Sequence, residues 1–124
     1  MTRPLIIGGG LAGGAAALRL AARGQPPLLL ERETGPHDKI CGEFVSVEAA
    51  RHLAALGFDL DRLGGAPIDT VRLHAGRRSA VARLPFRATG LSRRVLDAAL
   101  LDAAEAAGAE VHRGVTVRRL VDGR

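Results

Sequence analysis

Short apolar segments separated by glycine-rich turns dominate the first quarter of the chain. Residues 5–7 are apolar and lead into glycines at 8–10, residues 11–23 are rich in alanine and leucine, and residues 27–30 are again largely apolar. Short apolar runs bounded by turn residues predict buried strands, and the alanine- and leucine-rich stretch predicts a helix that ends before Gly24. This order of strand, helix and strand predicts a βαβ unit.

The middle of the chain predicts a second helix and a β-hairpin. Ser46 is a suitable N-cap and Gly57 a suitable terminator for the helix between them. Residues 71–74 and 79–84, on either side of Gly76, are typical of two short strands joined by a tight turn.

The last third predicts a helix followed by strands. Ser92 and Gly108 are suitable for the two ends of the helix, and residues 109–112 and 115–120 are expected to be strands. Residues 121–124 then supply a hairpin turn without a return strand. Because such a turn leaves an unpaired edge, we expect the chain to be a truncated part of a longer domain.

Composition narrows the possible functions. With 124 residues, of which 47% are hydrophobic, the chain is expected to form one domain over 1–124 with its own core. A single cysteine excludes an internal disulfide framework and agrees with a cytoplasmic setting. No apolar run in the sequence reaches the roughly 18 residues that a membrane span needs.

The charged, aromatic and histidine residues argue against nucleic-acid binding and against metal binding. The net charge of +5 comes from arginines scattered along the sequence, and the chain has three phenylalanines but neither tryptophan nor tyrosine. A nucleic-acid surface usually shows clustered cations and aromatic platforms, so we expect no nucleic-acid partner. The four histidines are far apart without ligand spacing, so no metal site is expected.

The glycine pattern at the first turn is typical of a dinucleotide site. Gly8, Gly10 and Gly13 form the spacing G-x-G-x-x-G between the first predicted strand and helix. The first glycine permits a sharp turn, the second leaves room for a phosphate, and the third lets helix and strand pack closely. Glu31, eighteen residues after Gly13, ends the second strand, where an acid accepts hydrogen bonds from a ribose diol.

Two further segments carry candidate chemistry. The polar loop at 32–46 is long enough to suggest a functional role. Arg93 and Arg94 stand in the first turn of the last predicted helix, where the helix dipole disfavours cations. Two guanidinium groups beside unpaired helical N–H groups indicate a bound phosphate or carboxylate, the alternative being that both side chains extend into water.

Together these motifs resemble those of FAD-dependent oxidoreductases in the geranylgeranyl reductase and aromatic-hydroxylase-like superfamily. The resemblance covers nearly the whole chain and is weakest over residues 59–88. It rests on the glycine motif extended to Ala17, Glu31, the loop Lys39-x-Cys41-Gly42-Glu43, and the helix Ser92-Arg93-x-x-Leu96-Asp97-x-x-Leu100. It implies an α/β fold: a Rossmann-like FAD-binding βαβ domain with a small β-hairpin excursion, truncated at its C-terminal end.

The resemblance also implies roles for individual residues. The pyrophosphate of FAD would be approached by Gly8, Gly10, Leu11, Ala12 and Gly13. Glu31 would hold the adenosine ribose, Arg32 would lie near the adenine, and Arg93 would reach the ribose or phosphate side.

The loop residues would serve the other end of the cofactor. Lys39, Cys41 and Gly42 would approach the flavin, where Cys41 would line the isoalloxazine pocket. A covalent flavin link or a redox thiol at Cys41 is the alternative to a small packing residue in a turn. No catalytic or metal-binding residue is assigned.

Three functions follow from this pattern. The first is the FAD-binding portion of a reductase or monooxygenase that uses NAD(P)H and a small-molecule substrate. The resemblance implies a later Gly-Asp segment that holds the flavin, and because this segment does not occur in the 124 residues, we expect the chain alone to be inactive. The second is an NAD-binding domain of a dehydrogenase, in which a third parallel strand should follow soon after the second. The third is a non-catalytic truncated remnant. The long loop and hairpin after the second strand favour FAD over NAD.

Overall fold

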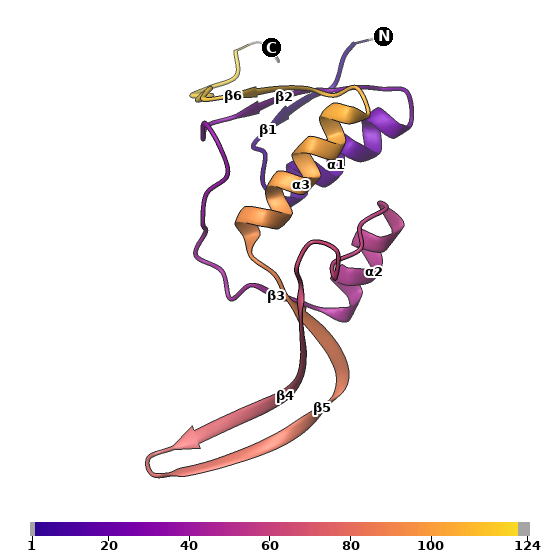
Figure 1. Ribbon diagram of the computed structural model, residues 1–124. Coiled ribbons are helices and arrows are strands. Elements are labelled where there is room, and N and C mark those ends of the chain that lie inside the picture. The colour runs from indigo at the N-terminus through magenta and orange to yellow at the C-terminus, as the bar shows by residue number, and fades with distance from the viewer. Residues whose placement is uncertain (1, 122–124) are drawn as a thin grey trace. The chain divides into compact units, whose positions relative to one another are not determined.

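The computed structural model describes residues 2–121, which fall into two compact units. The first unit comprises the described residues of Met1–Ile40 and Arg93–Arg124, and the second comprises Cys41–Ser92 (Figure 1). The helices and strands follow one another as β1 Leu5–Ile7, α1 Leu11–Ala22, β2 Leu28–Glu31, β3 Phe44–Val45, α2 Val47–Ala55, β4 Ala66–Ala75, β5 Arg78–Gly90, α3 Arg93–Ala106 and β6 Glu110–Arg113.

The first unit is a parallel sheet with two helices on one face. The strand order is β1-β2-β6, with Leu29 of β2 opposite both Ile6 and Val111 in the register. Figure 1 shows α1 and α3 side by side against this sheet. The predicted βαβ unit is confirmed, and the strand predicted at 109–112 is β6, displaced by one residue. A third parallel strand, β6, therefore does exist and pairs with β2. In the sequence, however, it is separated from β2 by the whole second unit and by α3.

Small residues allow the helices of this unit to pack closely. The core cluster consists of Ala17, Ala21, Leu29, Leu101, Ala104 and Ala109. A Cβ added at Gly14 of α1 would lie 3.0 Å from the Leu100 Cβ of α3, so the absence of a side chain permits this approach. Leu29 and Leu100 are fully buried, and burial of a leucine side chain contributes about 1.5–3 kcal/mol.

A glycine cap ends α1 where the sequence predicts it. Gly24 has a φ of +76°, its N–H donates to the Ala21 carbonyl at 2.9 Å, and the Gln25 N–H donates to the Leu20 carbonyl at 3.0 Å. These two bonds form a Schellman motif, which satisfies carbonyl groups at the helix end. Gly108, with a φ of +106°, follows α3 in the same left-handed region.

The second unit contains a long antiparallel hairpin and one helix. Its sheet has the order β3-β5-β4, and β4 and β5 extend the predicted hairpin at both ends. The predicted helix α2 is confirmed, because the Ser46 hydroxyl accepts a hydrogen bond from the Ala49 N–H at 3.2 Å and Gly57 follows with a φ of +90°.

The strand predicted at 115–120 is wrong. Gly114 has a φ of +72°, which bends the chain after β6, and residues 115–120 form no helix or strand. Alternation of apolar and polar residues produces a strand only where a neighbouring strand offers ladder partners. Here the segment is tied to the sheet through the Val115 N–H, which donates to the Glu31 carbonyl at 2.9 Å. The turn predicted at 121–124 falls on residues 122–124, outside the described residues.

Over residues 2–121, the structure contains no helix that is both long and apolar enough to cross a membrane.

The close approach of α1 to the glycine turn leads to a stability prediction. A Cβ at position 13 would lie 1.8 Å from the Gly8 carbonyl oxygen, so Gly13→Ala forces the glycine turn and α1 apart. We expect a loss of about 2–3 kcal/mol in the free energy of unfolding, as in other overpacked sites, measured by urea denaturation.

Gly35→Ala is the matched control. Its Cβ would meet nothing within 4 Å, and Gly35 does not have a positive φ. We expect this variant to differ from the wild type by less than about 1 kcal/mol. Equal stability of the two variants would contradict the close approach of Gly13 to Gly8.

Candidate functional site

The turn between β1 and α1 is shaped by two of its glycines. Gly8 has a φ of +99°, and its N–H donates to the Leu30 carbonyl on β2 at 2.8 Å. Gly10 is the N-cap of α1, so no capping side chain competes for the N–H groups of the first helical turn. These N–H groups and the positive end of the helix dipole favour a bound anion.

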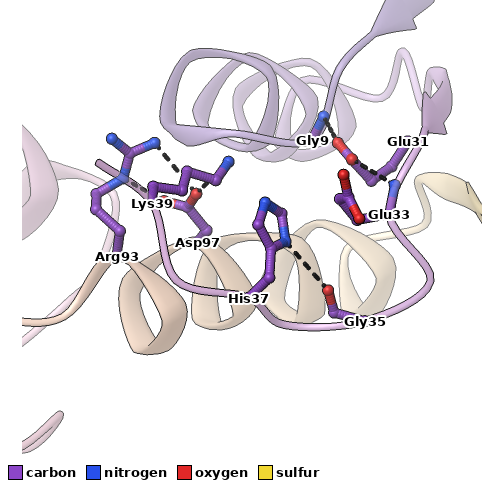
Figure 2. Close-up of polar contacts among 8 residues, drawn as sticks. All are labelled: Gly9, Glu31, Glu33, Gly35, His37, Lys39, Arg93 and Asp97. Carbon is purple, nitrogen blue, oxygen red and sulfur yellow. Dashed lines mark hydrogen bonds and ion pairs between the residues drawn. The ribbon is translucent and has the colours of Figure 1, made fainter. Parts of the chain in front are cut away.

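Glu31, at the end of β2, accepts hydrogen bonds from two backbone segments. One carboxylate oxygen accepts from the Gly9 N–H, and the other accepts from the Glu33 N–H at 2.8 Å (Figure 2). Burial raises the pKa of this carboxyl, but the two N–H donors and the Coulomb effects of Lys39 and His37 together outweigh burial, and the pKa lies below its usual value of 4.5. The side chain is therefore ionised at neutral pH and accepts hydrogen bonds.

Two cationic side chains stand beside Gly10. A Cβ added at Gly10 would lie 3.4 Å from Lys39 Nζ and 3.7 Å from Arg93 Nη2. Lys39 comes from the loop after β2 and Arg93 is the first residue of α3, and both contact Asp97 (Figure 2). The missing side chain at Gly10 therefore leaves space next to two positive charges, which is suited to a phosphate group.

An open groove of about 370 Å³ lies at the carboxyl ends of the parallel strands. It brings together five of the predicted site residues, namely Gly8, Gly10, Glu31, Arg32 and Lys39. Arg32 pairs with Glu33 at 3.1 Å, and its side chain is 73% exposed, so it lies at the rim of the groove. Residues from the first glycine turn, the end of β2 and the following loop thus share one site.

The other predicted residues lie outside the lining of this groove. Leu11, Ala12 and Gly13 form the first turn of α1, directly after the glycine turn. Cys41 and Gly42 belong to the second unit, where Cys41 is exposed and its sulfur accepts a hydrogen bond from the Glu43 N–H at 3.4 Å. That these two residues approach a flavin stays a prediction.

The two arginines at the start of α3 have different surroundings. Arg93 has a side chain that is 21% exposed and is paired with Asp97, whereas Arg94 is 55% exposed and lies 3.9 Å from Asp38. Only Arg93 is within 4 Å of the space beside Gly10. The role of an anion-binding residue therefore suits Arg93 better than Arg94.

Sequence analysis missed three contributors to the site. His37 and the segment 115–117 line the groove, and Asp97 holds the two cations. The ion pair of Arg93 and Asp97 could have been predicted from the sequence, because residues four positions apart on a helix are neighbours. The sequence carries no comparable signal for 115–117, which reaches the groove because Val115 is bonded to Glu31.

The donors and acceptors at this groove fit the phosphate and ribose parts of an adenosine diphosphate group. Positive charges and helical N–H groups meet at Gly10, and an ionised carboxylate acceptor stands at Glu31 on the neighbouring strand. The first set suits phosphate oxygens and the second suits ribose hydroxyls. The described residues therefore have the donor and acceptor set that a dinucleotide cofactor requires.

Comparison with known proteins agrees with this geometry. The profile of the FAD binding domain family matches residues 1–123. No curated protein matches the chain.

Solved structures share the fold. The flavin-dependent monooxygenase PieE, solved in complex with FAD and substrate, is 22% identical with a TM-score of 0.75, and the match covers 92% of this chain and 24% of PieE. The geranylgeranyl bacteriochlorophyll reductase-like protein from Thermoplasma acidophilum is 24% identical with a TM-score of 0.70, over 89% of this chain and 28% of that protein. The myxobacterial chondrochloren halogenase CndH is 27% identical with a TM-score of 0.71, and the match covers 89% of this chain and 28% of CndH. The chain spans less than a third of each of these proteins.

The lowered pKa of Glu31 predicts how stability responds to acid. Because the pKa in the folded state lies below 4.5, the ionised carboxylate stabilises the fold above that pH, and the stabilisation is lost as the pH falls through the folded-state pKa. We expect the wild type to lose stability more steeply than Glu31→Gln between about pH 6 and about pH 3, measured as urea midpoints.

The comparison of the wild type with Glu31→Gln isolates the contribution of Glu31 to the acid dependence of stability. The pKa values of Glu48 and Glu110 are also lowered, by the Glu48 backbone N–H and by the Arg3 guanidinium. Both groups are present in wild type and variant, so their effects cancel in the difference. Parallel acid profiles for the two proteins would show that the Gly9 and Glu33 N–H groups do not hold this carboxylate.

Proposed function

The chain belongs to the FAD binding domain family, and we propose that it forms the cofactor-binding part of an oxidoreductase whose flavin is reduced by NAD(P)H. The observation that carries the proposal is the meeting of the glycine turn at Gly10, the carboxylate of Glu31 and the cation Lys39 at one groove. A second cation, Arg93, stands next to Gly10. FAD is a dinucleotide with a pyrophosphate and an adenosine ribose, so its polar groups match these three features.

The proposed roles of the residues follow from their positions. The pyrophosphate would lie against Gly8 and Gly10 and the first turn of α1, formed by Leu11, Ala12 and Gly13. The helical N–H groups of this turn and the dipole of α1 would stabilise its negative charge.

The charged side chains would hold the remaining groups of the nucleotide half. Glu31 would accept hydrogen bonds from the ribose hydroxyls, and Arg32, at the rim, would lie beside the adenine. Arg93 and Lys39 would contact the phosphate side. For Lys39 this proposal differs from the role implied by the family resemblance, because its ammonium group stands next to the glycine turn in the structure.

The chemistry of such an enzyme resides in its cofactor. When bound, FAD supplies hydride and electron transfer, while the protein binds it and orients it. The solved relatives include a monooxygenase, a reductase-like protein and a halogenase, so this domain supports several reactions. We propose that NAD(P)H and a small-molecule substrate bind to further parts of a larger enzyme, which either reduces a double bond or hydroxylates its substrate.

Calorimetry tests the choice of cofactor. We expect the purified chain to bind FAD with measurable heat and NAD more weakly, because the family match assigns FAD and the groove suits its adenosine diphosphate half. Clear binding of NAD without binding of FAD would overturn the proposal in favour of a dehydrogenase domain. Binding of neither cofactor would support a non-catalytic remnant.

A substitution in the glycine turn tests the proposed location. Gly10→Ala places a Cβ in the space beside Lys39 and Arg93, and we expect FAD affinity to fall by about tenfold or more, which corresponds to about 1.4 kcal/mol. Gly35→Ala, whose Cβ would meet no atom within 4 Å, is the control and should keep the wild-type affinity. Unchanged affinity in Gly10→Ala, with an intact circular dichroism spectrum, would place the pyrophosphate elsewhere.

A further inference from the structure

Asp97 is a buried charged residue at the edge of the proposed cofactor site. It lies on α3, one turn after Arg93, and is only 8% exposed. Burial of an ionised carboxylate is unfavourable unless cations and hydrogen bonds compensate for the lost water. An aliphatic residue at this position of α3 would avoid that penalty, so the presence of a carboxylate calls for an explanation beyond packing.

The carboxylate of Asp97 binds two cations from different parts of the first unit. Arg93 Nε donates to Oδ1 at 2.8 Å and Nη2 donates to Oδ2 at 3.1 Å, which is a bidentate contact. Lys39 Nζ lies 2.9 Å from the same Oδ2. The side chains of Lys39 and Arg93 are 26% and 21% exposed, so both are largely shielded from water. Figure 2 shows both cations beside Asp97.

Asp97 sets where these positive charges are placed. The atoms that contact its Oδ2, Lys39 Nζ and Arg93 Nη2, are also those that stand 3.4 Å and 3.7 Å from the Cβ position of Gly10. Long cationic side chains normally lose rotamer freedom when they bind a ligand. Here the carboxylate of Asp97 holds both cationic side chains beside the glycine turn before any ligand binds.

We propose that Asp97 is a positioning residue, which holds Lys39 and Arg93 ready for the pyrophosphate and so makes the site selective for ligands that carry phosphate. This inference rests on the proposed function, because it assigns the space beside Gly10 to the pyrophosphate. Asp97 acts through the two cations, and the adenosine end of the ligand is left to Glu31.

Two effects of Asp97 on an anionic ligand have opposite signs. Its negative charge reduces the net charge of the three-residue cluster from +2 to +1, which by itself weakens attraction for phosphate. Its fixing of the cations strengthens phosphate binding, because charge-assisted hydrogen bonds depend on geometry. The positioning role therefore predicts a loss of affinity when the negative charge is removed, whereas simple electrostatics predicts a gain.

The experiment compares two probe ligands on the full chain. The affinities of ADP, which carries the pyrophosphate, and of adenosine, which lacks it, are measured by NMR titration of the ¹⁵N-labelled protein. For Asp97→Asn we expect ADP affinity to fall by about tenfold, the scale of one charge-assisted hydrogen bond, and adenosine affinity to stay within about twofold.

Asp102→Asn is the matched control for charge and helix. Asp102 also lies on α3, but its side chain is 71% exposed and it lies 3.8 Å from Arg113. This variant removes the same charge from the same helix. Because the ion pair of Asp102 is with Arg113 and not with Lys39 or Arg93, we expect wild-type affinities for both ligands. A comparable loss of ADP affinity in Asp102→Asn would overturn the positioning role, because the loss would then not depend on the contacts that Asp97 makes with Lys39 and Arg93.

A second variant keeps the test decisive if Asp97→Asn folds poorly. Lys39→Gln changes a loop residue, and we expect about a tenfold loss of ADP affinity with adenosine affinity preserved. In the Asp97→Asn background the same change should cost less, because Lys39 is no longer held in place. Equal losses for ADP and adenosine in either variant would assign Asp97 a purely structural role, and additive losses in the double variant would overturn the coupling.

The outcomes separate this inference from the proposed function. Unchanged or increased ADP affinity in Asp97→Asn, with FAD and ADP binding to the wild type, overturns only the positioning role. Failure of the wild type to bind FAD or ADP overturns the proposed function and the positioning role together.

Discussion

The site depends on one close contact between backbone segments, the approach of α1 to the glycine turn. With no side chain at Gly13, the helix starts directly against the Gly8 carbonyl, where a Cβ would lie 1.8 Å from the oxygen. The same turn is bonded to β2 through the Gly8 N–H and the Leu30 carbonyl. The positive end of α1 and the end of β2 are therefore held at the same edge of the sheet, and the groove exists because of this arrangement.

The charged residues of the first unit extend this constraint to segments that are distant in sequence. Glu31 binds the N–H groups of Gly9 and Glu33, so one carboxylate joins the turn before α1 to the loop after β2. Asp97 joins that loop to α3 through Lys39. The loop after β2 is thus held by two acids, Glu31 and Asp97, while Lys39 of this loop and Arg93 stand beside Gly10. Under the proposed function, these fixed charges of opposite sign would distinguish the ribose hydroxyls from the phosphate oxygens.

The parts of the structure that local chemistry controls were predictable from the sequence. The helix cap at Gly24, the Ser46 N-cap and the glycine turn each depend on residues within a few positions of one another. The pairing of β6 with β2 and the contact of Lys39 with Asp97 join segments that are far apart in sequence, and no local pattern encodes them. For the same reason the alternation at 115–120 was misleading, because a strand needs a neighbour that the segment itself does not reveal.

The hairpin formed by β4 and β5 has a consequence for how molecules of this protein meet in solution. Its strand β4 is one edge of the sheet β3-β5-β4, and Leu73 on β4 and Val81 on β5 are 67% and 56% exposed. The charged residues in this hairpin are Arg72, Arg77, Arg78, Arg83, Arg87 and a single acid, Asp69. Two copies that approach through their hairpins therefore repel over a Debye length of about 8 Å at physiological ionic strength. Added salt shortens that range and weakens the repulsion, so ionic strength controls how closely two copies approach through these exposed apolar side chains.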